Sequence, residues 1–475
     1  MAGVSPSTQN KPVNDEVTAK NYTGPLIIVT LLFFMWGFIT CMNDILIPKL
    51  QQVFVLQHWQ AMLIQTAFFG AYFIISLLYF IFSVVKGDPI MKIGYKNGII
   101  VGLVVAAAGC ALFYPAADLQ SYGFFLMALF VLASGITILQ IAANPYVTIL
   151  GPSSSAASRL NMTQALNSFG TTVAPLIGGY LIFEAVNTVS TNGAESVKMP
   201  YLGLAATLIA IAVMIKLAKL PHVKGEGRII PDSGALKYRH LVLGIVCIFM
   251  YVGGEVAIGS TLINFFKLPH IAGLSEVEGG HYLAFFWGGA MIGRFFGAVA
   301  LAEFKNNNTK YLIIAAITAI TVTLIYTTFG QNEALIALGL IVVNFLVLLL
   351  GRFLPGRTLG FFASAVIVLL LITTFASGAV AMWSVIAIGL FNSIMFPTIF
   401  TLAIKGLGVH TSQGSSLLVM AIVGGAIIPP LQGYVADVTG NLQISFIVPM
   451  LCYLYIVFYG FSGSKVEKID PSAEE

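Results

Sequence analysis

The chain has 475 residues, of which 58% are hydrophobic and only 9% are charged. Ordinary soluble domains carry about 25% charged residues, so this composition excludes a soluble fold and indicates that the lipid bilayer is the solvent. The net charge of +4 does not indicate a nucleic-acid partner, because the basic residues lie in short loops, where they set membrane topology.

The apolar runs divide the chain into two halves. Residues 1–24 form a polar segment without a signal-peptide layout, which we expect to be a cytoplasmic tail. A helix needs about 20 apolar residues to cross a bilayer, and the first half, 25–218, contains six such runs. The predicted spans of this half are 25–47, 60–85, 97–115, 122–149, 160–183 and 200–218.

A polar, basic linker at 219–240 precedes a second half at 241–462, and a cytoplasmic tail is expected at 463–475. The predicted spans of this half are 241–266, 281–303, 310–329, 333–351, 359–376, 379–404, 413–435 and 443–462. The sequence therefore predicts an all-α membrane protein with 14 transmembrane helices.

The distribution of basic residues predicts the orientation. If the N-terminus is cytoplasmic, the inner segments hold nineteen of the 23 Lys and Arg residues and the outer segments hold three. Cytoplasmic loops are enriched in Lys and Arg. We therefore expect a multi-pass protein of the bacterial inner membrane with both termini in the cytoplasm.

The cysteines and histidines do not form a chemical site in the sequence. Cys41, Cys110, Cys247 and Cys452 all lie in apolar runs without a CxxC spacing, which favours small buried residues over disulfides or metal ligands. The six histidines are scattered in or beside loops. We expect no metal, no cofactor and no enzymatic activity.

Two neighbouring spans carry polar residues at helical spacing. Gln140 and Asn144 lie at i and i+4 in the fourth span, and Asn161, Gln164, Asn167 and Ser168 lie on one face of the fifth. Single residues of this kind often join helices by hydrogen bonds. Two adjacent stripes favour a polar cavity, and carboxamides both donate to and accept from sugar hydroxyls.

Three ionisable residues lie deep in apolar context, where charges are costly and usually functional. Asp44 shares a helix face with Phe33, Trp36 and Thr40, so a carboxylate lies beside an aromatic platform that can stack on a sugar. We expect Asp44 to carry the coupling proton, the alternative being an Asp at the headgroup level. Glu255 could bind the ion, bind substrate or pair with Arg294, which we expect to be structural.

Several segments in both halves resemble the fucose–proton symporter family of the major facilitator superfamily. The matching stretches include FMWGFITCMNDILIPKLQQVF (34–54), QTAFFGAYFI (65–74), AANPYVTILGP (142–152), SRLNMTQALNSFG (158–170) and GSSLLVMAIVGGAI (414–427). The resemblance implies two six-helix bundles with a sugar between them near mid-membrane. It also implies that Asp44 links proton coupling to sugar recognition, and that Gln140, Asn144, Asn161 and Gln164 line the sugar site.

The chain departs from the family pattern at two points. Gln140 replaces a Glu of the fucose permease and cannot titrate, which makes the chain more similar to the glucose/galactose branch. The two spans at about 310–351 exceed the family's twelve helices, and we expect them to form a peripheral hairpin inserted into the second bundle.

We therefore predict a monomeric secondary transporter that imports a monosaccharide, with glucose or galactose favoured, by proton-coupled symport through alternating access. Sodium coupling, or fucose, mannose or N-acetylglucosamine as substrate, remain alternatives, and a non-transporting sugar sensor is a more distant one. The predicted coupling residues are Asp44 and Glu255. The predicted sugar-binding residues are Trp36, Asn43, Asp44, Gln65, Gln140, Asn144, Asn161, Gln164 and Asn392.

Overall fold

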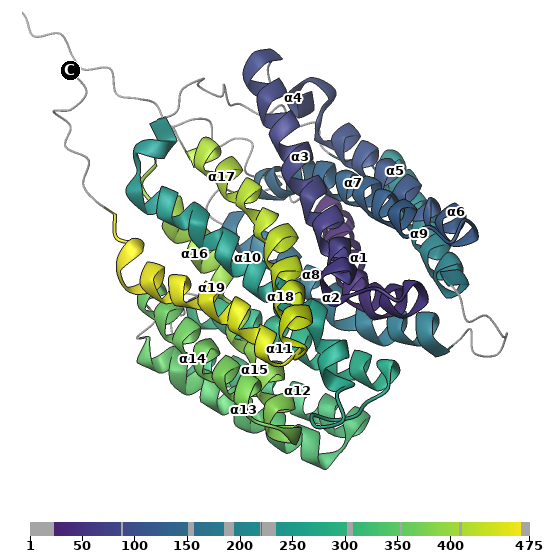
Figure 1. Ribbon diagram of the computed structural model, residues 1–475. Helices are drawn as coiled ribbons and strands as arrows, with labels where there is room; N and C mark the ends of the chain where they lie inside the picture. The colour runs from purple at the N-terminus through teal and green to yellow at the C-terminus, as the bar shows by residue number, and fades with distance from the viewer. Residues whose placement is uncertain are drawn as a thin grey trace, which may run out of the picture.

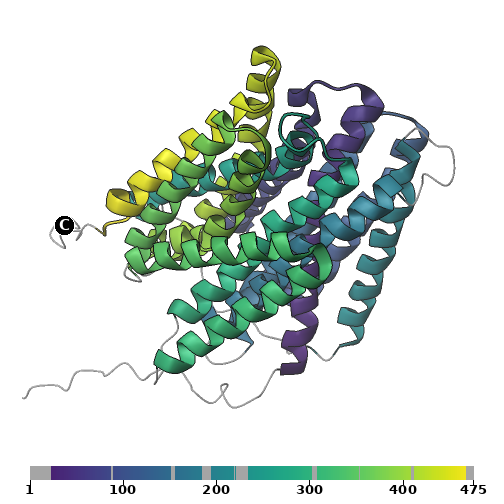
Figure 2. The same ribbon diagram turned by 90° about the horizontal axis from the view of Figure 1, so that it is seen from below.

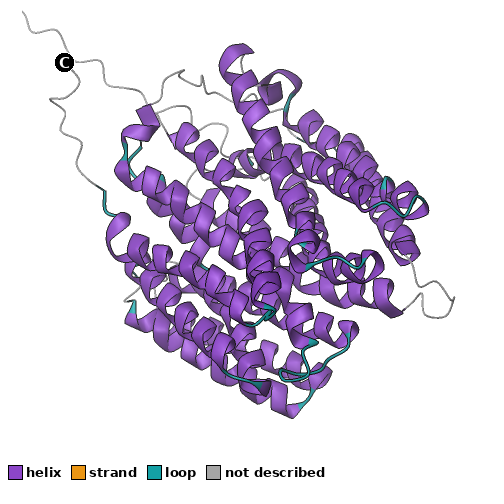
Figure 3. Cartoon of the chain, in the orientation of Figure 1, coloured by secondary structure: helices purple, strands orange, loops and turns teal. Residues whose placement is uncertain are grey.

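The computed structural model describes residues 23–86, 89–150, 156–184, 194–218, 220, 234–301, 307–351, 354–407 and 411–466. Every element assigned in these ranges is a helix (Figure 3). Most of the predicted linker at 219–240 and most of both predicted tails lie outside the described residues.

The first half of the chain forms the helices coloured purple to teal in Figure 1. Its elements are α1 (Thr23–Phe54), α2 (His58–Ala61), α3 (Leu63–Lys86), α4 (Pro89–Ile93), α5 (Tyr95–Ala111), α6 (Phe113–Asp118), α7 (Tyr122–Ile149), α8 (Ala156–Gly179), the π-helical η3 (Tyr180–Glu184), the 3₁₀ turn η4 (Ala194–Val197) and α9 (Lys198–Leu217).

The second half forms the helices coloured teal to yellow, which lie beside the first half in both ribbon views (Figures 1 and 2). Its elements are η5 (Gly234–Lys237), α10 (Arg239–Phe266), α11 (Glu276–Leu301), α12 (Asn307–Phe329), α13 (Gln331–Leu350), α14 (Pro355–Phe375), α15 (Gly378–Asn392), α16 (Met395–Ala403), α17 (Thr411–Met420), η7 (Ala421–Val423), α18 (Gly424–Thr439), η8 (Ile444–Phe446), α19 (Ile447–Phe458) and η9 (Tyr459–Gly463).

The apolar helices match the spans expected from the sequence. Within the described residues, 13 segments are long and apolar enough to cross a membrane. The remaining predicted span, 281–303, corresponds to α11, a helix of 26 residues that contains Arg294. The prediction of an all-α membrane protein with about 14 spans is confirmed.

The α12–α13 hairpin lies on the outside of the second half. Ile314 is the one buried residue among the described side chains of α12, and 22% of the most apolar stretch of α13 is buried. The hairpin packs on α11 and α15 through Phe296, Ile314, Ile341 and Leu390, and α13 also contacts α14. Asn344 of α13 adds one hydrogen bond from its Nδ2 to the Leu390 carbonyl oxygen, at 3.4 Å.

Close helix approach joins the first helix of each half to a later partner. A Cβ atom at Gly37 of α1 would lie 2.0 Å from the Asn167 carbonyl oxygen of α8, and one at Gly424 of α18 would lie 1.9 Å from the Phe249 carbonyl oxygen of α10. Only glycine permits such backbone contact, which is a common device of membrane helix packing. In both halves, therefore, the first helix packs closely on a later helix through a glycine contact.

Two spans that the sequence analysis treated as continuous are interrupted, and both contain proline. The span at 379–404 breaks between Asn392 and Met395, and the span at 413–435 contains the 3₁₀ turn η7. Proline has no N–H group, so the carbonyl oxygen four residues before it lacks its helical donor. Pro397 and Pro430 free the carbonyl oxygens of Ser393 and Ala426 in this way, and both accept side-chain hydrogen bonds.

Candidate functional site

Asp44 lies on α1 at the junction of the two halves, with only 3% of its surface exposed. Its Oδ1 atom accepts hydrogen bonds from Gln65 Nε2 at 3.0 Å and Ser260 Oγ at 3.1 Å. Its Oδ2 atom accepts from Trp287 Nε1 at 3.2 Å and from the Cys41 thiol at 3.7 Å. Both carboxylate oxygens are therefore satisfied by donors from α1, α3, α10 and α11.

The energetics of this cluster depend on the donors. A buried carboxylate without partners costs far more than a neutral polar group, and each hydrogen bond to a charged group contributes about 1.5–3 kcal/mol. No ion pair joins Asp44 to a cationic side chain in the part of the chain that the structure describes. Neutral donors, shared between the two halves, hold this carboxyl group.

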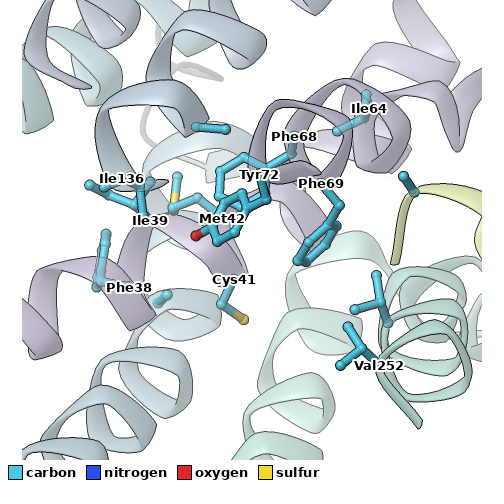
Figure 4. Packing of buried hydrophobic residues seen from close by; sticks show 14 of the residues in the cluster. Phe38, Ile39, Cys41, Met42, Ile64, Phe68, Phe69, Tyr72, Ile136 and Val252 are labelled. Carbon is cyan, nitrogen blue, oxygen red and sulfur yellow. The ribbon is translucent and has the colours of Figure 1, made fainter. Parts of the chain in front are cut away.

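A small cavity of about 30 Å³ adjoins Asp44. Phe69 of α3 projects into this region, near Cys41 of α1 and Val252 of α10 (Figure 4). The cavity is lined from both halves, by Thr40, Cys41, Asp44, Gln65, Phe69, Thr171, Val256 and Trp287. It therefore brings an aromatic surface and a carboxyl group into one enclosed space.

Gln140 belongs to a second cluster in the first half. Its Nε2 atom donates to the Tyr72 hydroxyl oxygen at 2.9 Å, and Trp36 and Thr40 also approach this hydroxyl group. Gln65, Phe69 and Tyr72 lie at i, i+4 and i+7 on α3, so they share one helix face. This face connects the Asp44 cluster with the Gln140 cluster.

Asn392 and Glu255 form a third cluster in the second half. The Tyr251 hydroxyl donates to Glu255 Oε1 at 2.7 Å and also approaches the Asn392 carbonyl oxygen at 3.0 Å. The Tyr453 hydroxyl donates to Asn392 Oδ1 at 2.7 Å. Two residues that the sequence analysis treated separately therefore share Tyr251 as a partner.

Three of the predicted sugar-binding carboxamides have a buried atom without a hydrogen-bond partner. These atoms are Asn43 Oδ1, Asn144 Oδ1 and Asn392 Nδ2. Most buried polar atoms in folded proteins are paired, so unpaired ones need an explanation. Two acceptors and one donor, all on carboxamides, suit a ligand that both donates and accepts.

The remaining predicted sugar-binding residues have fewer described contacts. Asn43 donates to Gln65 Oε1 at 3.4 Å and so joins the Asp44 cluster. Gln164 is half-buried on α8. Asn161 also lies in α8, but its side chain is outside the described part of the structure. The sequence analysis missed Tyr72, Ser260 and Trp287, whose only signal was a polar group within an apolar helix.

Arg294 of α11 bridges the halves. It donates from Nη1 to the Ser168 hydroxyl of α8 and from Nε to the Ser393 carbonyl oxygen, at 3.3 Å for the latter. Glu255 is near enough to attract it electrostatically, but no ion pair within 4 Å joins the two described side chains. Glu255 and Arg294 therefore do not form a direct ion pair in this structure.

The halves also meet at one end of the molecule, where α2 lies beside α18 (Figure 1); we call it the α2 end. The Asp437 carboxylate accepts the backbone N–H groups of His58 at 3.0 Å and Trp59 at 2.9 Å. Asn264 Nδ2 donates to Gln51 Oε1 at 2.7 Å, and the Thr66 hydroxyl donates to the freed Ala426 carbonyl oxygen at 2.8 Å. These contacts close the α2 end.

The family model described as "Major Facilitator Superfamily" matches residues 26–351. This chain belongs to the major facilitator superfamily. The expectation drawn from the sequence resemblance is confirmed.

Curated members of the superfamily resemble the chain over almost its whole length. It is 49% identical to a Brucella abortus protein named glucose/galactose transporter, over 96% of this chain and 98% of the relative. It is 32% identical to the Escherichia coli L-fucose-proton symporter, over 97% of this chain and 98% of the relative. These superfamily relatives are transporters and not enzymes.

A solved structure of the same superfamily shows the same fold. The structure of FucP in the outward conformation matches with a TM-score of 0.63 and 32% identity, covering 94% of this chain and all of that one. The predicted major facilitator superfamily fold is thus confirmed.

Proposed function

We propose that this superfamily member is a secondary transporter, not an enzyme, that imports a monosaccharide by proton-coupled symport. The observation that carries the proposal is Asp44, a buried carboxyl group held by donors from both halves beside a cavity. A group of this kind can link the charge on one side chain to the relative position of the two bundles.

Glucose and galactose are the favoured substrates. The support is the name of the Brucella abortus relative, together with the unpaired carboxamide atoms of Asn43, Asn144 and Asn392. Carboxamides bind hydroxyl groups without selecting for charge, and the cavity supplies Phe69 and Trp287 as apolar surfaces for a sugar ring. Fucose, mannose and N-acetylglucosamine satisfy the same chemistry and belong in the substrate panel.

Proton coupling through Asp44 alone is the simplest mechanism. Gln140 stands where the fucose permease has a Glu and donates to Tyr72 as a neutral side chain. Glu255 shares its Oε1 atom with Tyr251 in a separate cluster, so we assign it a secondary coupling role. Sodium is the alternative ion, and imposed gradients of each ion distinguish them.

We further propose that the protein lies in the bacterial inner membrane as a monomer, with both termini cytoplasmic. The support is the excess of basic residues in the predicted inner segments. In this orientation the α2 end is periplasmic, so the contacts of Asp437, Asn264 and Thr66 correspond to a state closed to the outside. Opening toward the periplasm requires these contacts to break.

The test is transport by the purified chain in liposomes with labelled sugars. Asp44→Asn should reduce the accumulation ratio to about one, because a carrier without a coupled ion only equilibrates its substrate. Sugar exchange, which needs no net proton movement, should continue at a reduced rate. Asp118→Asn, at an exposed residue paired with Lys198, is the matched control and should accumulate sugar normally.

Uphill accumulation that persists in Asp44→Asn would remove Asp44 from the coupling role. Accumulation driven by a sodium gradient and not by a proton gradient would replace the coupling ion. The absence of exchange for every sugar in the panel would contradict sugar transport itself.

A further inference from the structure

Two of the donors to Asp44 belong to the second half. Ser260 lies on α10 and Trp287 on α11, whereas Asp44 and Gln65 lie on α1 and α3. The Ser260 hydroxyl also contacts Gln65 Nε2 at 2.7 Å. Separation of the halves at the α2 end would remove Ser260 and Trp287 from the carboxyl group and leave Gln65 and Cys41 in place.

The donors distinguish the charged carboxylate from the neutral acid. An ionised carboxylate only accepts hydrogen bonds, whereas a protonated one presents an O–H donor. The Trp287 indole N–H can only donate, so a proton on Oδ2 would have only the weakly accepting Cys41 sulfur as a partner. On Oδ1 a proton would face the Gln65 amide, and only the Ser260 hydroxyl can rotate to accept it. The closed arrangement therefore fits the ionised form.

The groups around Asp44 indicate that Ser260 and Trp287 cause this preference for the ionised form. Cys41 of α1 is the titratable group that contacts Asp44, and α3, α10 and α11 present the neutral Gln65, Ser260 and Trp287. Among the described residues, no Lys, Arg or His forms an ion pair with Asp44. A fixed positive charge therefore does not account for the carboxylate in this state.

We infer that Ser260 and Trp287 are positioning residues that couple closure of the α2 end to proton release from Asp44. The inference rests on the proposed function. When the halves meet, the two donors stabilise the carboxylate, and the proton leaves Asp44 toward the side opposite the α2 end. When the halves separate, the donors withdraw and Asp44 binds a proton again. Ser260 and Trp287 thus give proton occupancy a different free energy in the two states, which coupling requires.

The experiment compares net uptake with exchange in liposomes that contain the full chain. Net uptake of labelled glucose or galactose is measured against internal pH at constant external pH, and each rate is divided by the exchange rate of the same variant. Trp287→Phe and Ser260→Ala remove one donor each. Both should retain the proton longer, so the internal pH for half-maximal net uptake should rise by about one unit, a tenfold change in proton affinity.

Matched variants separate this role from general damage to the protein. Trp383→Phe changes a tryptophan that packs on Tyr282 and Phe285, and Ser364→Ala removes a hydroxyl bonded to the Gly360 carbonyl oxygen. Neither should move the pH profile. Ser260→Thr keeps a hydroxyl group and should restore the profile of the unaltered chain.

Three results would overturn the inference. One is an unchanged internal pH profile in both Trp287→Phe and Ser260→Ala. Another is a raised KM for sugar with an unchanged profile, which would make Trp287 a sugar ligand only. The third is a shift of the same size in the control variants. If the unaltered chain exchanges no sugar, the proposed function fails first and the inference fails with it.

Discussion

Asn392 shows how one proline prepares a polar residue for binding. Pro397 interrupts the span, α15 ends at Asn392, and the Asn392 carbonyl oxygen lies 3.0 Å from the Tyr251 hydroxyl oxygen. Tyr453 fixes the side-chain oxygen, which directs the unpaired Nδ2 group as a free donor in a fully buried position. A preoriented, unpaired donor is suited to a sugar hydroxyl oxygen.

We predict that Asn392→Ala raises the KM for the transported sugar about tenfold, because the loss of one buried hydrogen bond costs about 1–3 kcal/mol. The measurement is the concentration dependence of exchange in liposomes. Asn344→Ala is the control, since Asn344 is equally buried but bonds to Leu390 on the hairpin side. An equal KM in both variants would remove Asn392 from the sugar site.

At the residue scale the sequence predicted those members of the Asp44 cluster that belong to the first half of the chain. Asn43, Asp44 and Gln65 were expected to act together, and the structure brings them into contact. Ser260 and Trp287 could not be predicted, because they lie more than 200 residues along the chain from Asp44. Helical periodicity identifies the face of a helix that is polar, but not the helix that packs against it.

Glu255 and Arg294 illustrate the same limit. Each lies within its own span, so a pair was a reasonable alternative. Glu255 lies 11 residues before the end of α10, and Arg294 lies 18 residues after the start of the following, oppositely directed α11. Counted from the loop that joins the two helices, the two positions therefore differ by seven residues. Position within an apolar run does not resolve such an offset.

At the scale of elements, apolar length predicted the helices but not their interruptions. Pro397 and Pro430 were both visible in the sequence, but proline is tolerated within many membrane helices, and Pro430 lies inside the continuous α18. Whether a proline breaks a span depends on which donor replaces the lost N–H. Here Arg294 and Thr66 supply those donors from other helices.

The α12–α13 hairpin gives a prediction at this scale. Deletion of residues 307–351, with a short linker in their place, should leave sugar uptake within about threefold of the intact chain, because α12 and α13 contribute little buried surface. The newly exposed side chains of Phe296 and Leu390 are apolar and compatible with lipid. Uptake and thermal unfolding of the purified protein are the measurements.

The control removes two other consecutive spans, at 355–403, which likewise preserves the orientation of later helices. Their most apolar stretches are 50% and 72% buried, so this deletion should abolish uptake and folding. If the hairpin deletion inserts and folds but does not transport, the hairpin is part of the transport pathway and not a peripheral addition.

At the scale of the whole molecule, Asp437 joins the two halves at the α2 end. Its two oxygens accept the N–H groups of His58 and Trp59, and Gly433, one turn earlier on α18, touches the same backbone. A carboxylate at the start of a helix also interacts favourably with its dipole. This contact exists only when the halves are together, so its whole free energy favours the state closed at the α2 end.

We predict that Asp437→Ala shifts the population toward the state open at the α2 end by about 5- to 30-fold, the equivalent of 1–2 kcal/mol. Spin labels on the exposed Gln52 and Val438 should report a longer distance in this variant. Asp118→Ala is the control, because its partner Lys198 lies in the same half and does not change with opening. Equal label distances in Asp437→Ala and the unaltered chain would show that this carboxylate does not hold the α2 end closed, and closure would then depend on Asn264, Thr66 and the donors to Asp44.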